Sequence, residues 1–284
     1  MKVYVATPPK LSHAMYRVAN ALERFAPDDF TVVQSEDEAD LLVLHVIGLE
    51  AVNYRTDKPV AVMQYCTGSA KRTAETMAPW LPLWYRAVMV WSYYDLSHFF
   101  PDGGFYHAPL GIDHAFRANN FDLLKKNHRD YMVMTSGYVN GRPQEAIEEP
   151  TLAAQICGGK SIHLGKFPVG ITPGLEINLL HAPSDPVLAS MLRRCKWVAG
   201  LRYVEGFEMG VIEGLACGAR PIVFDRPDNR HWFGDHAQYI AELESANILC
   251  SLEYYFRQEP SPVTAEERSA VLAKFNWKTL VTGF

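Results

Sequence analysis

The chain of 284 residues is 48% hydrophobic and carries a formal net charge of −5. This length and composition suit a globular protein with two modest domains or one large one. The acidic balance lacks the overall basic footprint that nucleic-acid-binding proteins usually carry, although it is compatible with a local basic groove.

The cysteines and the apolar runs of the chain indicate its cellular compartment. The five cysteines are odd in number and form no Cys-x-x-Cys pair, which favours free thiols in a reducing cytoplasm over a disulfide framework. The opening Met-Lys-Val-Tyr-Val-Ala reads as a short strand and not as a secretory signal. Apolar runs stay shorter than the roughly 18 residues that a membrane helix needs. We therefore predict a cytoplasmic protein without a transmembrane segment.

In the first half of the chain, short apolar runs alternate with helical patterns, which is typical of α/β layering. The clearest helix covers residues 12–25, where apolar residues recur at helical spacing behind Ser12 as a candidate N-cap. The candidate strands are residues 2–6, 30–34, 41–47, 60–65, 87–91 and 105–109. This pattern predicts one parallel-sheet domain.

A polar stretch at residues 117–130 marks a linker or boundary, and a second α/β series follows it. The candidate strands of this series are residues 131–135, 161–164, 176–181, 197–201 and 221–224. Its candidate helices are residues 143–157, 185–195, 209–217 and, at the C-terminal end, 266–280. Two Rossmann-like halves would place a ligand crevice at the carboxyl ends of their strands.

The most informative segment begins at Glu205 and ends at Phe224. It opens as a loop, enters a short apolar helix and stops at Gly218, a glycine of the kind that ends helices. A loop-to-helix junction directs free N–H groups and the positive helix end at one point, which favours an anion. The carboxylates of Glu205 and Glu213 cannot favour a phosphate, but they suit neutral hydroxyls on either side of it. A phosphate flanked by hydroxyls indicates a sugar nucleotide. The alternative is an ordinary amphipathic helix with two solvated glutamates.

Glu205 and Glu213 stand eight positions apart, in the wording Glu-Gly-Phe-Glu and Glu-Gly-Leu-Ala-Cys-Gly, just before a strand that starts near a proline. This pattern resembles the Glu-x7-Glu motif of retaining glycosyltransferases with the GT-B architecture, especially the GT4 group. Further landmarks that resemble this family lie at residues 107–116, 185–199 and 275–277. The similarity covers residues 105–284 well and residues 1–104 only by pattern.

The resemblance implies an α/β protein with the GT-B fold, in which two Rossmann-like domains flank an inter-domain cleft. The acceptor-side domain would cover residues 1–115. The nucleotide-sugar-binding domain would cover residues 116–284, with a last helix that crosses back to the first domain. The implied activity is metal-independent transfer of a hexosyl or pentosyl group, with retention, from a nucleotide-diphosphate sugar to an acceptor hydroxyl. The nucleotide sugar is a substrate in this scheme, and no cofactor is implied.

The resemblance also implies separate roles for the residues of the motif. Glu213 would hold the ribose hydroxyls of the nucleotide, and the helix that begins near Met209 would face the phosphates. The donor sugar would be held by Glu205 together with the main chain at Gly206, Phe207 and Glu208.

One departure from the family concerns the charge that offsets the diphosphate. The family carries an Arg and a Lys after the first strand of the second domain, and the matching loop here is residues 136–143. Tyr138 stands at the Arg position, and Arg142 is the only cation near the Lys position. We expect Arg142 to offset the phosphate charge, with Lys166 as the next candidate. The alternative is that Arg142 is a solvated loop residue.

A second departure lies in the first domain. Many family members carry a His near the donor sugar, at the end of a strand where this chain has Gln64, Tyr65 and Cys66. Tyr65 or Gln64 could still present a hydrogen bond there. The glycine-rich first loop is also replaced, by residues 7–13. Contacts to the phosphates or the acceptor could come from Lys10, Ser12 and His13. By contrast, His45 and His107 are expected to be structural histidines.

The acceptor stays open at this stage. Lipids, glycans and small metabolites are the usual acceptors in the family, but phage enzymes of this architecture modify a hydroxymethylated base in DNA. Aromatic residues between positions 80 and 94 would suit a flipped base, whereas the acidic balance argues against DNA. A degenerate module that binds a nucleotide sugar without transferring it is the non-enzyme alternative. The scattered histidines and the cysteines predict no metal site.

Overall fold

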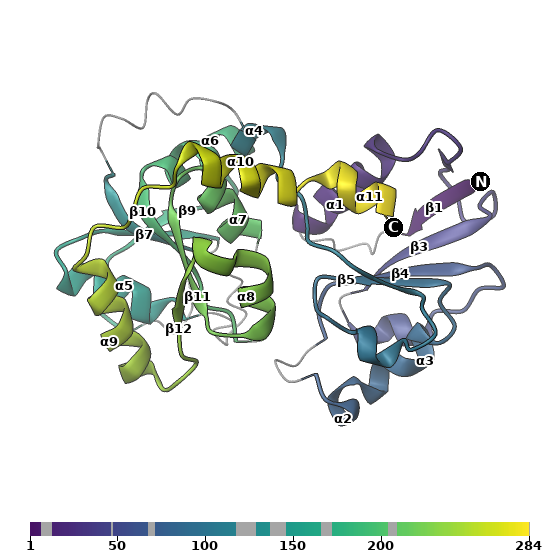
Figure 1. The fold of residues 1–284 in the computed structure, drawn as a ribbon, viewed down its shortest axis with the longest axis horizontal. Coiled ribbons are helices and arrows are strands. Elements are labelled where there is room, and N and C mark those ends of the chain that lie inside the picture. Colours follow the sequence, from purple (N-terminus) through teal and green to yellow (C-terminus); the bar gives the residue numbers. More distant parts are fainter. Residues whose placement is uncertain are drawn as a thin grey trace. The chain divides into compact units, whose positions relative to one another are not determined.

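The computed structural model describes residues 1–6, 13–46, 48–67, 72–117, 129–136, 146–165, 172–203 and 209–283. The chain divides into two compact units, one of Met1–Gly111 with Phe275–Phe284 and one of Ile112–Lys274. Each unit contains a six-stranded sheet whose neighbouring strands are all parallel (Figure 1). The first unit ends at Gly111 and the second begins at Ile112. The family resemblance implied a boundary between residues 115 and 116.

The first unit has the strand order β2-β1-β3-β4-β5-β6. Its strands are β1 (Lys2–Ala6), β2 (Thr31–Val32), β3 (Leu41–Val46), β4 (Val60–Gln64), β5 (Met89–Ser92) and β6 (Phe105–His107). All five residues of β4 are buried, as expected for a parallel sheet covered on both faces. Its helices are α1 (His13–Arg24), η1 (Leu49–Asn53), α2 (Ala74–Met77), η2 (Ala78–Trp80), α3 (Leu81–Trp84), η3 (Ser97–Phe99) and α11 (Trp277–Gly283).

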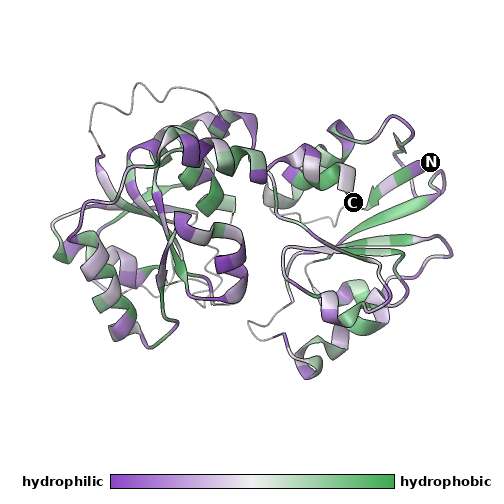
Figure 2. Cartoon of the chain, in the orientation of Figure 1, coloured by the Kyte–Doolittle hydropathy of each residue, from purple (hydrophilic) through white to green (hydrophobic). Residues whose placement is uncertain are grey.

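The second unit has the strand order β12-β11-β10-β7-β8-β9. Its strands are β7 (Tyr131–Ser136), β8 (Ser161–Leu164), β9 (Ile177–Leu180), β10 (Cys195–Gly200), β11 (Arg220–Phe224) and β12 (Gln238–Ile240). Its helices are α4 (His114–Arg117), α5 (Glu148–Ile156), α6 (Asp185–Arg193), α7 (Met209–Ala216), α8 (Pro227–Phe233), η5 (Gly234–His236), α9 (Ser245–Phe256) and α10 (Ala265–Lys274). Figure 2 shows that the strands in the middle of each sheet carry mostly hydrophobic residues.

All of the strands expected from the sequence are present, with bounds that match or differ by a few residues. The expected C-terminal helix at residues 266–280 is instead two helices, α10 and α11, in separate units. The break falls at Phe275 and Asn276, where the Asn276 side chain accepts a hydrogen bond from the backbone N–H of Lys278 at 3.0 Å. This is the hydrogen bond of a helix N-cap, and it starts α11 anew. The Tyr106 hydroxyl donates to the Thr279 carbonyl at 3.1 Å, so α11 packs within the first unit.

Buried arginines tie the second unit together at the ends of its elements. The Arg268 guanidinium donates to the carbonyls of Ala216 at 2.8 Å and of Arg117 at 2.8 Å, where α7 and α4 end. The Arg220 guanidinium donates to the Glu267 carboxylate at 3.0 Å and to the Ser261 and Pro262 carbonyls at 2.9 and 3.0 Å. Each bond replaces water at a carbonyl or carboxylate that folding removes from solvent.

Glu267 has two tasks in this arrangement. Its carboxylate pairs with Arg220, and it also forms a capping box with Thr264 at the start of α10. In this capping box, the backbone N–H of Thr264 donates to the Glu267 carboxylate at 2.8 Å, and the backbone N–H of Glu267 donates to the Thr264 hydroxyl at 3.1 Å. The hydrogen bond from Arg220 is the main reason that the pKa of Glu267 falls from 4.5 to about 2. The carboxylate form therefore stabilises the folded chain above about pH 4.5, and this contribution is lost as the pH falls towards 2.

Glu267→Gln should lower the free energy of unfolding at pH 7 by about 1.5–3 kcal/mol, the usual range for a hydrogen bond to a charged group. Glutamine can still close the capping box, so the substitution removes the charge in particular. Urea unfolding at several pH values would measure this loss, together with a flatter decline below pH 4.5. The neighbouring, fully exposed Glu266 gives the control variant, Glu266→Gln. Equal effects of the two substitutions would contradict the assignment.

Candidate active site

Helix α7 lies directly against strand β10 because glycines stand at the contact. A Cβ added to Gly214 would lie 2.6 Å from Val198 Cγ1, and one added to Gly200 would lie 2.4 Å from Val211 Cγ2. Real Cβ atoms do not approach carbon so closely, so only glycine permits this separation of helix and strand. At its other end the helix stops at Gly218, whose φ of 95° favours glycine.

The beginning of α7 lies beside the carboxyl end of a neighbouring strand. A Cβ on Gly210 would lie 3.4 Å from Oγ of Ser136, the last residue of β7. Strands β7 and β10 are adjacent and parallel, so their carboxyl ends and the first turn of α7 share one edge of the sheet. The first turn of a helix has backbone N–H groups without partners inside the helix, and these attract anions. In open parallel α/β sheets, ligands bind at the carboxyl ends of the strands.

Glu213 stands in the second turn of α7 and is 2% exposed. Burial raises the pKa of the Cys217 thiol to about 12, and the Glu213 carboxylate one turn earlier acts in the same direction. A buried carboxylate is costly unless hydrogen-bond donors surround it. Glu213 is therefore not a solvated residue of an amphipathic helix, and that alternative fails for this member of the glutamate pair.

Two further polar contacts fix the same edge of the sheet. Thr135 Oγ1 lies 2.9 Å from Nδ1 of the fully buried His163, which joins the ends of β7 and β8. Burial lowers the pKa of His163 to about 4, so its ring is neutral at pH 7. Beyond β11, the Arg226 guanidinium donates to the Glu242 carboxylate at 2.9 Å and to the Tyr203 carbonyl at 3.1 Å. A carboxylate thus already balances the charge of Arg226.

These supporting residues belong to none of the motifs that the sequence carries. Ser136 and Thr135 could have been found as polar residues at the carboxyl end of a predicted strand. Arg226 follows another such strand by two positions, but its pairing with Glu242 depends on a contact across sixteen residues. Neither partner carries a local signal for that pairing.

Most of the predicted site residues lie outside the described residues. They are Lys10, Ser12, Tyr138, Arg142, Lys166, Glu205, Gly206, Phe207 and Glu208. His13 begins α1, and Met209 is the largely buried first residue of α7. The roles suggested for these residues stay predictions.

Tyr65 and Gln64 are both turned into the interior of the first unit. The Tyr65 hydroxyl lies 2.7 Å from Nδ1 of His45, and the two rings stack with centroids 5.6 Å apart. Gln64 donates to the Cys66 carbonyl at 2.7 Å and accepts from the Trp84 indole at 2.9 Å. Burial lowers the pKa of His45 to about 4 and raises that of Tyr65 well above 10. His45 is thus a structural histidine, as expected, and the Tyr65 hydroxyl bonds to it.

Among the described residues, no helix is long and apolar enough to cross a membrane. The two units, each with a parallel six-stranded sheet and flanking helices, have the GT-B fold, and the solved structures described next share it. No family model and no curated protein matches the sequence.

Solved structures that share the fold over nearly the whole chain include the following three. HepE of Anabaena in complex with UDP-glucose has 13% sequence identity and a TM-score of 0.70, and the match covers 99% of this chain and 97% of HepE. Sucrose-phosphate synthase from Thermosynechococcus elongatus has 10% identity and a TM-score of 0.71, covering 99% and 96%. AviGT4, a glycosyltransferase involved in avilamycin A biosynthesis, has 11% identity and a TM-score of 0.62, covering 99% and 94%. At these identities the shared feature is the fold.

The contact between α7 and β10 can be tested with two glycines of the same helix. Gly214→Ala and Gly210→Ala bring a similar gain in helix propensity, but only the first places a Cβ within 2.6 Å of Val198. We expect Gly214→Ala to be less stable than Gly210→Ala by about 1–3 kcal/mol, the usual cost of overpacking. Chemical denaturation of both variants measures the difference. Equal stability would mean that α7 can move away from β10 without cost.

Proposed function

We propose that the protein is a glycosyltransferase that transfers a sugar from a nucleoside-diphosphate donor to an acceptor hydroxyl. The observation that carries the proposal is the buried carboxylate of Glu213 in a helix whose first turn lies at the carboxyl edge of the sheet. Such an arrangement offers amide donors for phosphate beside a carboxylate acceptor for hydroxyls. The full-length similarity in fold to HepE, which was solved with UDP-glucose, supports the same donor class.

The proposed mechanism is retaining and of the GT4 type. Glu213 accepts hydrogen bonds from the ribose hydroxyls, and Glu205 with the main chain of 206–208 holds the donor sugar. The amides at the start of α7 and the cation of Arg142, with Lys166 as the second candidate, stabilise the leaving diphosphate in place of a metal ion. The acceptor hydroxyl attacks from the face that the diphosphate leaves and passes its proton to that group. The protein then contributes positioning and electrostatic stabilisation.

Glu213→Gln should weaken donor binding by roughly 10-fold to 150-fold, because hydrogen bonds to a charged acceptor are worth about 1.5–3 kcal/mol. Thermal shifts of the wild type and the variant with UDP-, GDP- and ADP-glucose measure this loss of donor affinity. A donor at about 100 times its dissociation constant should add roughly 2.7 kcal/mol to the wild type.

Glu176→Gln serves as the matched control, since Glu176 is exposed and precedes β9 at the opposite edge of the sheet. The same donor shift in both variants would contradict the role of Glu213. Donor binding without hydrolysis or transfer would instead identify a degenerate binding module.

Arg142→Ala should lower kcat by about 10²-fold, the usual effect of removing one donor that stabilises developing negative charge. The leaving diphosphate gains charge in the transition state, so turnover should fall more than donor affinity. Arg142→Lys should recover only part of the rate, because a point charge does not replace the guanidinium fork. Steady-state kinetics of these variants and of Lys166→Ala decide between the two cations. Wild-type kcat in Arg142→Ala with an inactive Lys166→Ala would assign the charge to Lys166.

A further inference from the structure

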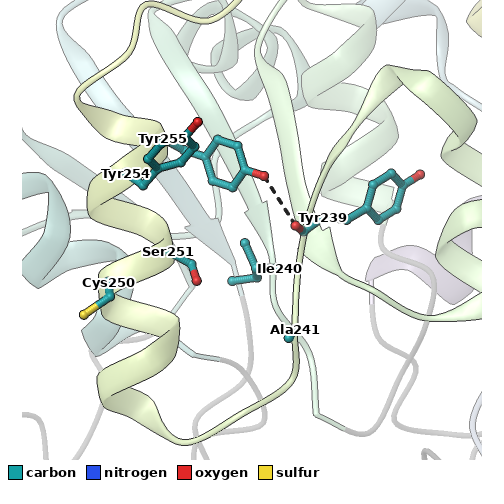
Figure 3. A pocket seen from close by; sticks show the side chains of 7 residues that line it. All are labelled: Tyr239, Ile240, Ala241, Cys250, Ser251, Tyr254 and Tyr255. Carbon is teal, nitrogen blue, oxygen red and sulfur yellow. Dashed lines mark hydrogen bonds between the residues drawn. The ribbon is translucent and has the colours of Figure 1, made fainter.

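A groove separate from the α7 site lies between helix α9 and strand β12 (Figure 3). Its volume is about 370 Å³, within the range of small-molecule sites. Seven residues line it: Tyr239, Ile240, Ala241, Cys250, Ser251, Tyr254 and Tyr255. All of them belong to the second unit.

One wall of the groove is a stripe along α9. Cys250, Ser251, Tyr254 and Tyr255 are spaced three and four positions apart, so they share a side of the helix. Another stripe, of Ile248, Leu252 and Phe256, is buried and anchors α9 in the core. Tyr254 is 64% exposed and is held at the rim. The helix thus presents the tyrosines on a fixed support.

The other wall is the main chain of β12, the last strand in its sheet. The Ile240 carbonyl accepts from Asp225 N–H at 2.8 Å and faces β11, so the main-chain polar groups of Tyr239 and Ala241 face the groove. The Tyr255 hydroxyl donates to the Tyr239 carbonyl at 3.5 Å, the weak limit of a hydrogen bond. The Tyr239 ring points away from α9, and its hydroxyl donates to the Gly234 carbonyl at 2.7 Å (Figure 3).

The chemistry of the lining favours a neutral, hydroxyl-rich ligand. None of the seven residues carries an acid or a base of the Asp, Glu, Lys or Arg type, so a charged ligand would find no ion partner among them. The Ser251 hydroxyl donates to the Asn247 carbonyl at 2.9 Å, which leaves its oxygen lone pairs to accept. The negative face of a tyrosine ring attracts weakly positive C–H groups, such as those on the face of a pyranose.

We propose that this groove is a carbohydrate-binding subsite, in which a pyranose ring stacks on Tyr254 and hydrogen-bonds to Ser251, Tyr255 and the edge of β12. An extended peptide is the competing occupant, because β12 is an edge strand. It is less favoured, since β12 is only three residues long. The subsite goes beyond the proposed transfer activity and does not require it.

The test is an NMR titration of tyrosine-labelled protein with maltotriose, cellotriose and chitotriose. We expect at least one of them to shift the Tyr254 and Tyr255 ring signals saturably, with a dissociation constant on the order of 1 mM. Tyr254→Ala should weaken that binding at least about five-fold by removing the stacking face. Tyr85→Ala, which removes a similarly exposed tyrosine (68%) in the first unit, should leave it unchanged.

The proposal would be overturned if no saccharide gave saturable shifts at about 50 mM, a concentration well above a millimolar dissociation constant. Equal weakening of saccharide binding by Tyr254→Ala and Tyr85→Ala would also overturn it. So would saturable binding of a Val-Thr-Val-Thr-Val peptide at Tyr254 without saccharide binding. Thermal shifts with UDP-, GDP- and ADP-glucose, repeated on Tyr254→Ala, keep the two proposals apart. Donor binding that persists when saccharide binding is lost assigns the loss to the groove alone.

Discussion

The close contact between helix α7 and strand β10 is the constraint on which the candidate site depends. Val198 and Val211 fill the space where Gly214 and Gly200 lack side chains, and the helix axis is set by that fit. Both the first turn of α7 and the Glu213 carboxylate take their places from it. A helix standing farther from the sheet would leave Glu213 open to water, and the carboxylate would lose the low-dielectric surroundings that strengthen its hydrogen bonds.

Interactions at the other end of α7 keep this placement rigid. Arg268 donates to the Ala216 carbonyl at the end of the helix, and Arg129 donates to the Gly218 carbonyl at 2.9 Å just beyond it. Because carbonyls at a helix C-terminus carry partial negative charge, a guanidinium there satisfies hydrogen bonds and opposes the dipole. Helix α7 thus packs against β10 and is held at its C-terminal end, while its first turn lies at the carboxyl edge of the sheet. Preorganisation of this kind is what the proposed transfer mechanism, which relies on positioning and electrostatic stabilisation, requires.

The groove beside α9 differs from the α7 site in the chemistry of its lining. Helix α9 is fixed by Ile248, Leu252 and Phe256 and supports uncharged groups at the surface, whereas the α7 site is proposed to gather charge around a phosphate. A diphosphate donor and an uncharged saccharide require different surroundings, and we propose that the second unit provides both. The two sites are separate in their residues, so their roles can be examined one at a time.

The sequence by itself determined the α/β class, most strands and the helix-ending glycine at Gly218, because these depend on local apolar period and on backbone conformation. The strands Lys2–Ala6 and Ser161–Leu164 were predicted with their observed bounds. Strand β12, which is three residues long, was not predicted. Only the tertiary structure decided which polar groups are buried. The sequence around Glu213 does not indicate whether its carboxylate is solvated or buried. The hydrogen-bonded pairs His45–Tyr65 and Thr135–His163 join residues that are 20 and 28 positions apart. Such contacts are set by how strands and helices pack, which no local pattern specifies.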